Sequence, residues 1–191
     1  MASTGSWSPA ALVAAAAAVV AVAGCASLDN SNSGGSAGSE LSRVKLYASV
    51  DELAADSPLI IEGTVASQSV AADIDPVTDF TLSVVTVQRT LQGDAATNTG
   101  TKIVVRQLGS TAQPPPVPLL TPGEVYLLYL TPTGLSGPLS SQYYVTGANA
   151  GIYVQEPPGQ AGKSTAPLFN QVQREPGESL PAQLDESRAI G

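Results

Sequence analysis

Residues 59–67 read LIIEGTVAS and residues 79–91 read DFTLSVVTVQRTL, and these two stretches decide the fold class. Both are rich in β-branched and apolar residues, a composition typical of strands. Gly63 interrupts the first stretch, which predicts a bend or a bulge there. In the second stretch the apolar residues change parity between Val84 and Val85, so we expect a bulge at that point that keeps both sets facing the core.

One helix and several shorter strands are expected around this pair. Further strands are expected at residues 101–108, 124–130, 142–146 and 151–155. Before them, Ser49 and Glu52 have the spacing of a capping box, in which Ser49 caps a helix and Glu52 reaches back to its amide. Pro58 prevents this helix from extending. One short helix with five or six strands predicts a mainly β domain, a small barrel or sandwich, and glycines at strand bends favour the barrel.

The chain is expected to divide into four segments by composition. A leader occupies residues 1–24, and a flexible tether rich in Ser, Gly and Asn occupies residues 25–42. The β domain follows at residues 43–156. The stretch 157–191 is rich in Pro and Gln, which predicts a loose and largely irregular tail.

The leader has the pattern of a bacterial lipoprotein signal. Ala10–Ala23 is an uncharged apolar run of about 14 residues, shorter than the roughly 20 needed to cross a bilayer. It ends in Val22, Ala23, Gly24 and Cys25, which resembles a lipobox. That resemblance implies a diacylglycerol thioether on Cys25, cleavage before it, and anchoring on the extracytoplasmic face of the cell membrane. The alternatives are an ordinary secretory signal and an unprocessed helix, and Cys25 has no role in either.

Composition excludes several classes of chemistry. The 191 residues include no histidine and one cysteine, and the formal net charge is −8. Imidazole-dependent catalysis and an intramolecular disulfide are therefore ruled out, and we expect no metal and no cofactor. Lys and Arg are scattered singly, so no nucleic-acid partner is expected. The segment Gly159–Ser164 resembles the last residues of a phosphate-binding loop. The full motif needs a further glycine where Pro157 stands, so no nucleotide partner is expected either.

The order of elements resembles a known fold family. The segments that carry the resemblance are Val50–Asp56, Leu59–Val65, Leu91–Gly93, Pro122–Leu130 and Tyr143–Gly151. They are similar to uncharacterised actinobacterial secreted proteins and, more remotely, to netrin-like (tissue-inhibitor-of-metalloproteinase-like) OB-fold domains. The resemblance covers Val50–Val154 and implies an OB-like barrel of five or six strands. The disulfide cysteines of that family are absent and Gln92 stands where a lysine is common, so the resemblance implies the fold and not protease inhibition.

Tyrosines on the expected late strands form the candidate ligand face. They are Tyr126, Tyr129, Tyr143, Tyr144 and Tyr153. OB-type barrels bind ligands, including sugars, through aromatic side chains on their strands. Because Tyr126 and Tyr129 have opposite parity, as do Tyr143 and Tyr144, core packing is the alternative for most of them.

Two carboxylate patterns complete the candidate sites. Asp73, Asp75 and Asp79 fall in one short segment, which suits either a hard-cation site or a solvated hairpin turn, and the failure of EF-hand spacing favours the turn. Glu62 and Glu124 are a candidate catalytic pair whose proximity the sequence does not establish. No residue is therefore assigned as catalytic.

Taken together, these patterns predict a membrane-anchored lipoprotein that serves as a non-catalytic binding or interaction module of the cell envelope. Its partner would be an envelope protein or a glycan. Two alternatives stay open: a carboxylate-dependent enzyme acting on glycan, and a purely structural envelope protein.

Overall fold

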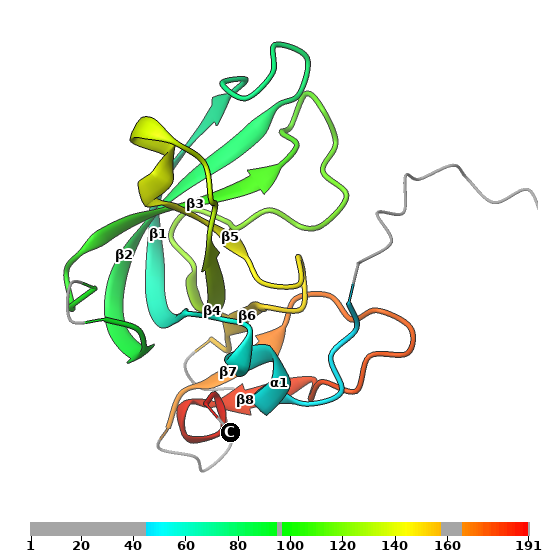
Figure 1. Cartoon of the computed structure of the whole chain (residues 1–191). Helices are drawn as coiled ribbons and strands as arrows, with labels where there is room; N and C mark the ends of the chain where they lie inside the picture. The colour runs from blue at the N-terminus through cyan, green and yellow to red at the C-terminus, as the bar shows by residue number, and fades with distance from the viewer. Residues whose placement is uncertain (1–44, 95–96, 158–165, 191) are drawn as a thin grey trace, which may run out of the picture. The chain divides into compact units, whose positions relative to one another are not determined.

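The computed structural model describes residues 45–94, 97–157 and 166–190, and this part of the chain is mainly β (Figure 1). The single α-helix of this part is α1 (Val50–Ala55). The strands are β1 (Leu59–Ala71), β2 (Phe80–Gln92), β3 (Lys102–Leu108), β4 (Val125–Pro132), β5 (Gln142–Val145), β6 (Ile152–Gln155), β7 (Leu168–Gln171) and β8 (Gln183–Asp185). Two 3-10 turns, η1 (Gly137–Ser141) and η2 (Glu186–Arg188), precede β5 and follow β8.

The strand pairings return to the strand from which they start. β1 pairs with β2, β2 with β3, and β3 with β5, the last pair being parallel. β5 then pairs with β4, and β4 pairs with β1, so that five strands form a closed circuit of pairings. The same sheet continues from β4 through β6 and β7 to β8. Figure 1 shows α1, β7 and β8 at one end of this domain and the connection between β1 and β2 at the opposite end.

The described residues bury two apolar clusters, and β1 and β4 contribute to both. We call the first the circuit core: Leu59, Ile61, Val65, Val85, Val87, Ile103, Val105, Leu120, Tyr126, Leu128, Leu130 and Ile152. We call the second the helix core: Tyr47, Leu53, Ala54, Ile60, Leu127, Tyr129, Ala150, Tyr153, Phe169, Leu180, Leu184 and Ala189. Successive side chains of a strand point to opposite faces. β1 and β4 therefore need apolar residues on both faces, which explains their nearly continuous apolar sequences.

The start of α1 confirms the predicted capping residues. The Ser49 hydroxyl accepts a hydrogen bond from the Glu52 amide at 3.2 Å. The Glu52 carboxylate accepts one from the amide of Ala48 at 2.9 Å, one residue earlier than the predicted Ser49 amide. Leu53 and Ala54 face the helix core, so the cap fixes the direction from which the helix approaches the sheet.

The predicted irregularity at Gly63 is confirmed. The register of β1 against β2 shifts between Glu62 and Gly63. The backbone of Gly63 lies so close to β2 that a Cβ there would be 2.6 Å from Cγ1 of Val85. Glycine is therefore required by close approach of two strands.

The predicted bulge near Val84 and Val85 is wrong, because the extra residue lies in β1. Val65 pairs with Val85 and Ser67 with Val84, which leaves Ala66 unpaired. Through residues 81–87, β2 alternates without interruption between buried and half-buried side chains. The even-numbered apolar residues of β2 lie on the outer, half-buried side of the sheet, so no bulge is needed to bring them to the core.

The prediction of an irregular tail is wrong for residues 166–190. β7 and β8 extend the sheet, and Leu180, Leu184 and Ala189 are buried in the helix core. The hydroxyl of Tyr129 donates a hydrogen bond to the carbonyl of Ala189 at 2.8 Å. Apolar residues are sparse in this segment, but they complete a surface formed by α1 and β4, which a local pattern does not reveal.

Candidate contact surface

A buried arginine holds the loop between β1 and β2. The guanidinium of Arg106, on β3, donates to both carboxylate oxygens of Asp73 at 2.7 and 2.8 Å. Its Nε donates to Oε1 of Gln142 at 2.8 Å, and its Cζ lies 5.0 Å from the centre of the Phe80 ring. The Arg106 side chain is fully buried, whereas that of Asp73 is 35% exposed. The hydrogen bonds from Arg106 lower the pKa of Asp73, so the pair stays ionised and fixes the start of the loop.

A second brace joins this loop to the loop between β3 and β4. Gln113 accepts a hydrogen bond from the Asp79 amide at 2.8 Å and donates one to the Val77 carbonyl at 3.1 Å. The Ser110 hydroxyl donates to the Asp79 carboxylate at 2.6 Å, and the Gly109 amide donates to the Asp79 carbonyl at 2.8 Å. These bonds hold the two loops together at one end of the circuit.

The three aspartates of the first loop have separate structural roles. Asp73 binds Arg106, Asp79 accepts from Ser110, and Asp75 accepts from the amide of Val77 at 2.9 Å. Hydrogen bonds from the Thr78 side chain and the Val77 amide lower the pKa of Asp75. Within the described residues no group of three His, Cys, Asp or Glu could hold a metal ion. The geometry fits the hairpin-turn interpretation of this segment.

Three aliphatic side chains are exposed at this braced end. Val70, Ile74 and Val77 are 55%, 43% and 79% exposed, and we call them the aliphatic tip. Large aliphatic side chains on a surface carry information when they gather in one place, because contiguous apolar patches mark interaction sites. This feature was not predicted from the sequence. The sequence contains aliphatic residues between positions 70 and 77, but the residues that hold their loop, Arg106 and Gln113, lie on β3 and in the loop after it.

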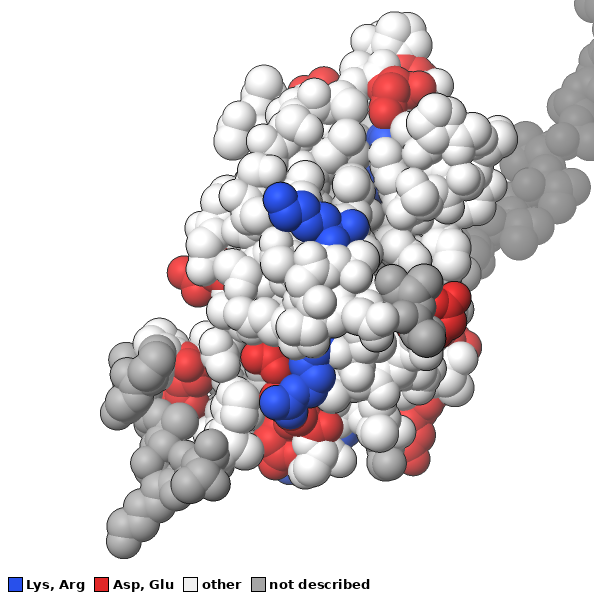
Figure 2. Space-filling model, turned by 90° about the vertical axis from the view of Figure 1, so that its left-hand side faces the viewer, with Lys and Arg blue, Asp and Glu red and all other residues white. Residues whose placement is uncertain are grey.

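A strip of half-buried side chains lies on the outer side of the circuit. It consists of Leu82 and Val84 on β2, Val104 on β3 and Tyr144 on β5. Leu82 and Tyr144 both pair with Arg106, so the strip passes the residue that holds the loop. Figure 2 looks onto the side that carries β2, and most of the middle of this side is uncharged apart from a Lys or Arg side chain in its upper half. Contacts there would be mainly apolar or hydrogen-bonded.

The five tyrosines of the predicted ligand face do not form one face. Tyr126, Tyr129 and Tyr153 are 4%, 0% and 0% exposed, so the prediction is wrong for these three. The Tyr126 hydroxyl accepts from the Thr121 amide at 3.0 Å. The rings of Tyr129 and Tyr153 lie 6.1 Å apart in the helix core, and burial raises the pKa of both hydroxyls. β4 is covered on both faces, so parity could not separate core from surface there.

The remaining two tyrosines lie on opposite faces of β5. Tyr143 is half-buried and packs against the circuit core. Tyr144 is half-buried on the outer side, in register with Arg106. Of the five predicted residues, Tyr144 alone lies within the strip described above.

The two carboxylates of the candidate pair lie in different surroundings. Glu62 pairs with Leu127 of β4, and its side chain is on the face of the helix core. Glu124 lies outside β4, directly after the turn at Pro122 and Gly123, and is exposed to solvent, whereas Glu62 is 8% exposed. Burial raises the pKa of Glu62, and the nearby charge of Arg89 opposes that shift.

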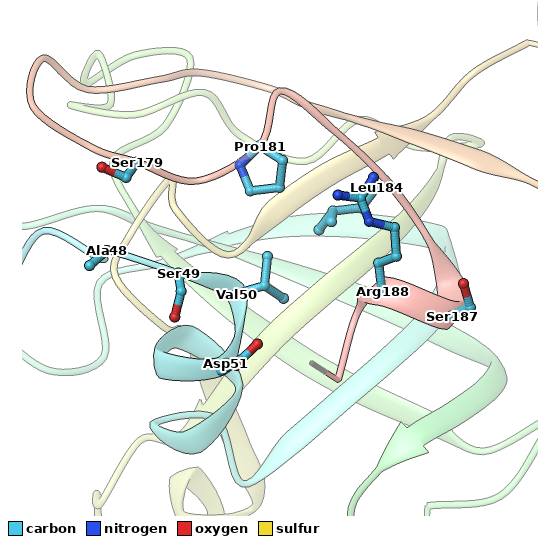
Figure 3. A pocket seen from close by; sticks show the side chains of 9 residues that line it. All are labelled: Ala48, Ser49, Val50, Asp51, Ser179, Pro181, Leu184, Ser187 and Arg188. Atoms are coloured by element: carbon cyan, nitrogen blue, oxygen red, sulfur yellow. The ribbon is translucent and has the colours of Figure 1, made fainter.

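A hollow of about 480 Å³ lies between the start of α1 and the C-terminal segment. It is lined by Ala48, Ser49, Val50, Asp51, Ser179, Pro181, Leu184, Ser187 and Arg188. Figure 3 shows Ala48, Ser49, Val50 and Asp51 on the helix side and the other residues on the C-terminal segment opposite. This hollow could not be predicted from the sequence, because its two walls come from opposite ends of the domain's sequence.

The residues of the predicted anchor lie outside the described part of the chain. They are Val22, Ala23, Gly24 and Cys25. The tether 25–42 and the segment Gly159–Ser164, which was compared with a phosphate loop, lie outside the described residues as well. In residues 45–94, 97–157 and 166–190, no helix is both long enough and apolar enough to cross a membrane.

The sequence matches no family model, and no curated protein shows significant similarity to it. The lipobox and the netrin-like resemblance therefore rest on the residues quoted for them. The function must be argued from the chemistry of this chain.

Proposed function

We propose that this chain is a bacterial lipoprotein, anchored on the extracytoplasmic face of the cell membrane through Cys25, with a non-catalytic binding module as its folded domain. The anchor is supported by the apolar run Ala10–Ala23 and by the lipobox-like sequence that ends at Cys25. Two or three acyl chains would give stable anchoring, since each buried methylene contributes about 0.8 kcal/mol.

We further propose that the domain is an OB-like barrel. The support is the closed circuit of five strands in which β3 and β5 make the parallel pair. OB folds bind ligands through the face of their second and third strands and through the loop between the first two. In this chain those positions correspond to Leu82, Val84 and Val104 of the strip and to the loop that carries the aliphatic tip, and Tyr144 lies beside them on β5.

The observation that carries the binding proposal is the combination of exposure and rigidity at this tip. Val70, Ile74 and Val77 are exposed to solvent, while Arg106 and Gln113 fix the loop backbone around them. A contact surface that is ordered before binding loses less conformational entropy when a partner binds. The enzyme alternative has less support, because Glu62 is largely buried in β1 while Glu124 is exposed in the segment before β4, and the described hollow is lined by neither.

The anchor is tested by mass spectrometry of the membrane fraction, comparing wild type with Cys25→Ala and with Ser27→Ala as the neighbouring control. We expect wild type and Ser27→Ala to begin at a Cys25 that carries diacylglycerol. Cys25→Ala should lack the lipid and remain unprocessed. A mature chain with an unmodified Cys25, or one that begins elsewhere, would contradict the anchor.

The binding role is tested by pull-down from native membranes with the anchored protein beside the soluble fragment 43–191. We expect both forms to recover the same partner. Recovery of no partner by either form would contradict the proposal of a binding module and would favour a structural role.

A further inference from the structure

Val77 is the most exposed of the large hydrophobic residues in the described part of the chain, at 79%. Its backbone is nevertheless held on both sides. The Val77 amide donates to the Asp75 carboxylate at 2.9 Å, and its carbonyl accepts from Gln113 at 3.1 Å. A side chain fixed in this way is presented to solvent at a defined position, as the contact residue of a docking surface would be.

The charge around Val77 is negative. Asp75 lies two residues before it and Asp79 two residues after it, and hydrogen bonds keep the pKa of Asp75 low. The nearby cation, Arg106, is buried and binds Asp73 through both ends of its guanidinium. A complementary surface would therefore offer an apolar pocket with positive charge at its rim.

The tip also lies away from the start of the domain. Lys45, the first described residue, forms ion pairs with Glu52 of α1 and with Asp56 directly after it. Figure 1 shows α1 at the opposite end of the domain from the connection between β1 and β2. The chain before Lys45 therefore joins the domain at its α1 end, the end opposite the tip.

We propose that Ile74 and Val77 dock into an apolar pocket, rimmed by Lys or Arg side chains, on a second protein of the cell envelope. The inference rests on the proposed function of the domain as a binding module and names the class of partner. A lipid surface fits less well, because anionic headgroups would repel Asp75 and Asp79.

The experiment uses the full-length protein in its native membrane with a photo-crosslinking amino acid at position 77. The matched control carries the same group at position 46, because Leu46 is 47% exposed and precedes α1. We expect one discrete protein adduct from position 77 and none from position 46. The crosslinked peptide of the partner, identified by mass spectrometry, should contain apolar residues flanked by Lys or Arg.

Two further variants test the chemistry of the contact. Asp75→Asn and an increase in salt from about 0.1 to 0.5 M should each lower the adduct yield several-fold, since salt screens exposed charges. Excess unlabelled wild type should compete for the adduct, whereas Val77→Asp should not. Circular dichroism should show Val77→Asp folded, because the side chain it replaces is exposed.

The outcomes distinguish failure of the docking proposal from failure of the proposed binding module. An adduct that is insensitive to salt and to Asp75→Asn, or one formed only with lipid or glycan, overturns the partner class while leaving a binding module in place. The absence of any adduct from position 77 overturns the docking role of the tip. If the pull-down also recovers no partner, the binding module itself is wrong.

Discussion

Replacing Gly63 by alanine should destabilise the domain by overpacking the circuit core. The new Cβ would lie 2.6 Å from Cγ1 of Val85 and 2.9 Å from the carbonyl oxygen of Thr86. Val85 is fully buried, and a β-branched side chain has few alternative rotamers. β1 cannot move away from β2 freely, because Gly63 also pairs with Tyr126 of β4 on its other edge.

The size of the effect follows from these contacts. Adding a methyl group to a well-packed core costs about 1–3 kcal/mol. We expect the upper half of that range for Gly63→Ala, because one of the two close atoms belongs to the backbone and cannot rotate away. For a domain of this size the melting temperature should fall by roughly 5–10 °C.

The assay is urea unfolding of the fragment 43–191 in a double-mutant cycle with Val85→Ala. Removal of Cγ1 of Val85 should relieve the closest contact, so the two substitutions together should cost about 1–2 kcal/mol less than their sum. Gly123→Ala is the control: no atom lies within 4 Å of its Cβ position, and its φ of +88° leaves backbone strain as the sole cost. If Gly63→Ala unfolds like wild type, or if Val85→Ala gives no relief, the overpacking argument is wrong.

Three further substitutions test other contacts. Tyr129→Phe leaves the buried carbonyl of Ala189 without its donor and should cost about 1–2 kcal/mol, with faster carboxypeptidase digestion; Tyr153→Phe, whose hydroxyl donates to Pro181 over a longer 3.3 Å, should cost less. Asp73→Ala should raise amide hydrogen exchange in residues 74–78 by about tenfold, whereas unchanged exchange there would show that Arg106 does not hold the loop. Burial raises the pKa of Glu62, so the folded chain binds the carboxyl proton of Glu62 more tightly than the unfolded chain does. The domain therefore loses stability as the pH rises from the pKa of the unfolded chain through that of the folded chain. Glu62→Gln should therefore be more stable than wild type at neutral pH in urea unfolding, and the difference should disappear below a pH of about 4, where an ordinary glutamate is protonated.

Local patterns were sufficient to predict most of the secondary structure. The cap at Ser49 and the strands that contain Ile61 and Val85 follow from hydrogen-bonding chemistry and side-chain periodicity within a few residues. The change of parity in β2 does not mark a bulge, because apolar side chains lie on both faces of this strand and are buried on one and half-buried on the other. Ala66, the residue that is unpaired, has nothing in its identity that marks a bulge.

The features that were not predicted depend on residues far apart in the chain. Tyr129 and Ala189 are 60 residues apart, and the brace from Gln113 to Val77 spans 36. The burial of Tyr129 could not be predicted from β4 alone, because the surface that covers it is completed by the C-terminal segment. The aliphatic tip could not be predicted for the same reason, since its loop is held by Arg106 of β3 and by Gln113 in the loop between β3 and β4.

The packing of the C-terminal segment against α1 and β1 constrains the order in which the domain can form during synthesis. Leu53 and Ile60 are among the first residues of the domain to be translated, yet they share the helix core with Leu184 and Ala189, which are among the last. Those early side chains stay uncovered for most of the synthesis of the domain, and they are targets for a chaperone during that time. A ribosome stalled before Leu184 would therefore hold a chain whose helix core is still open on one side.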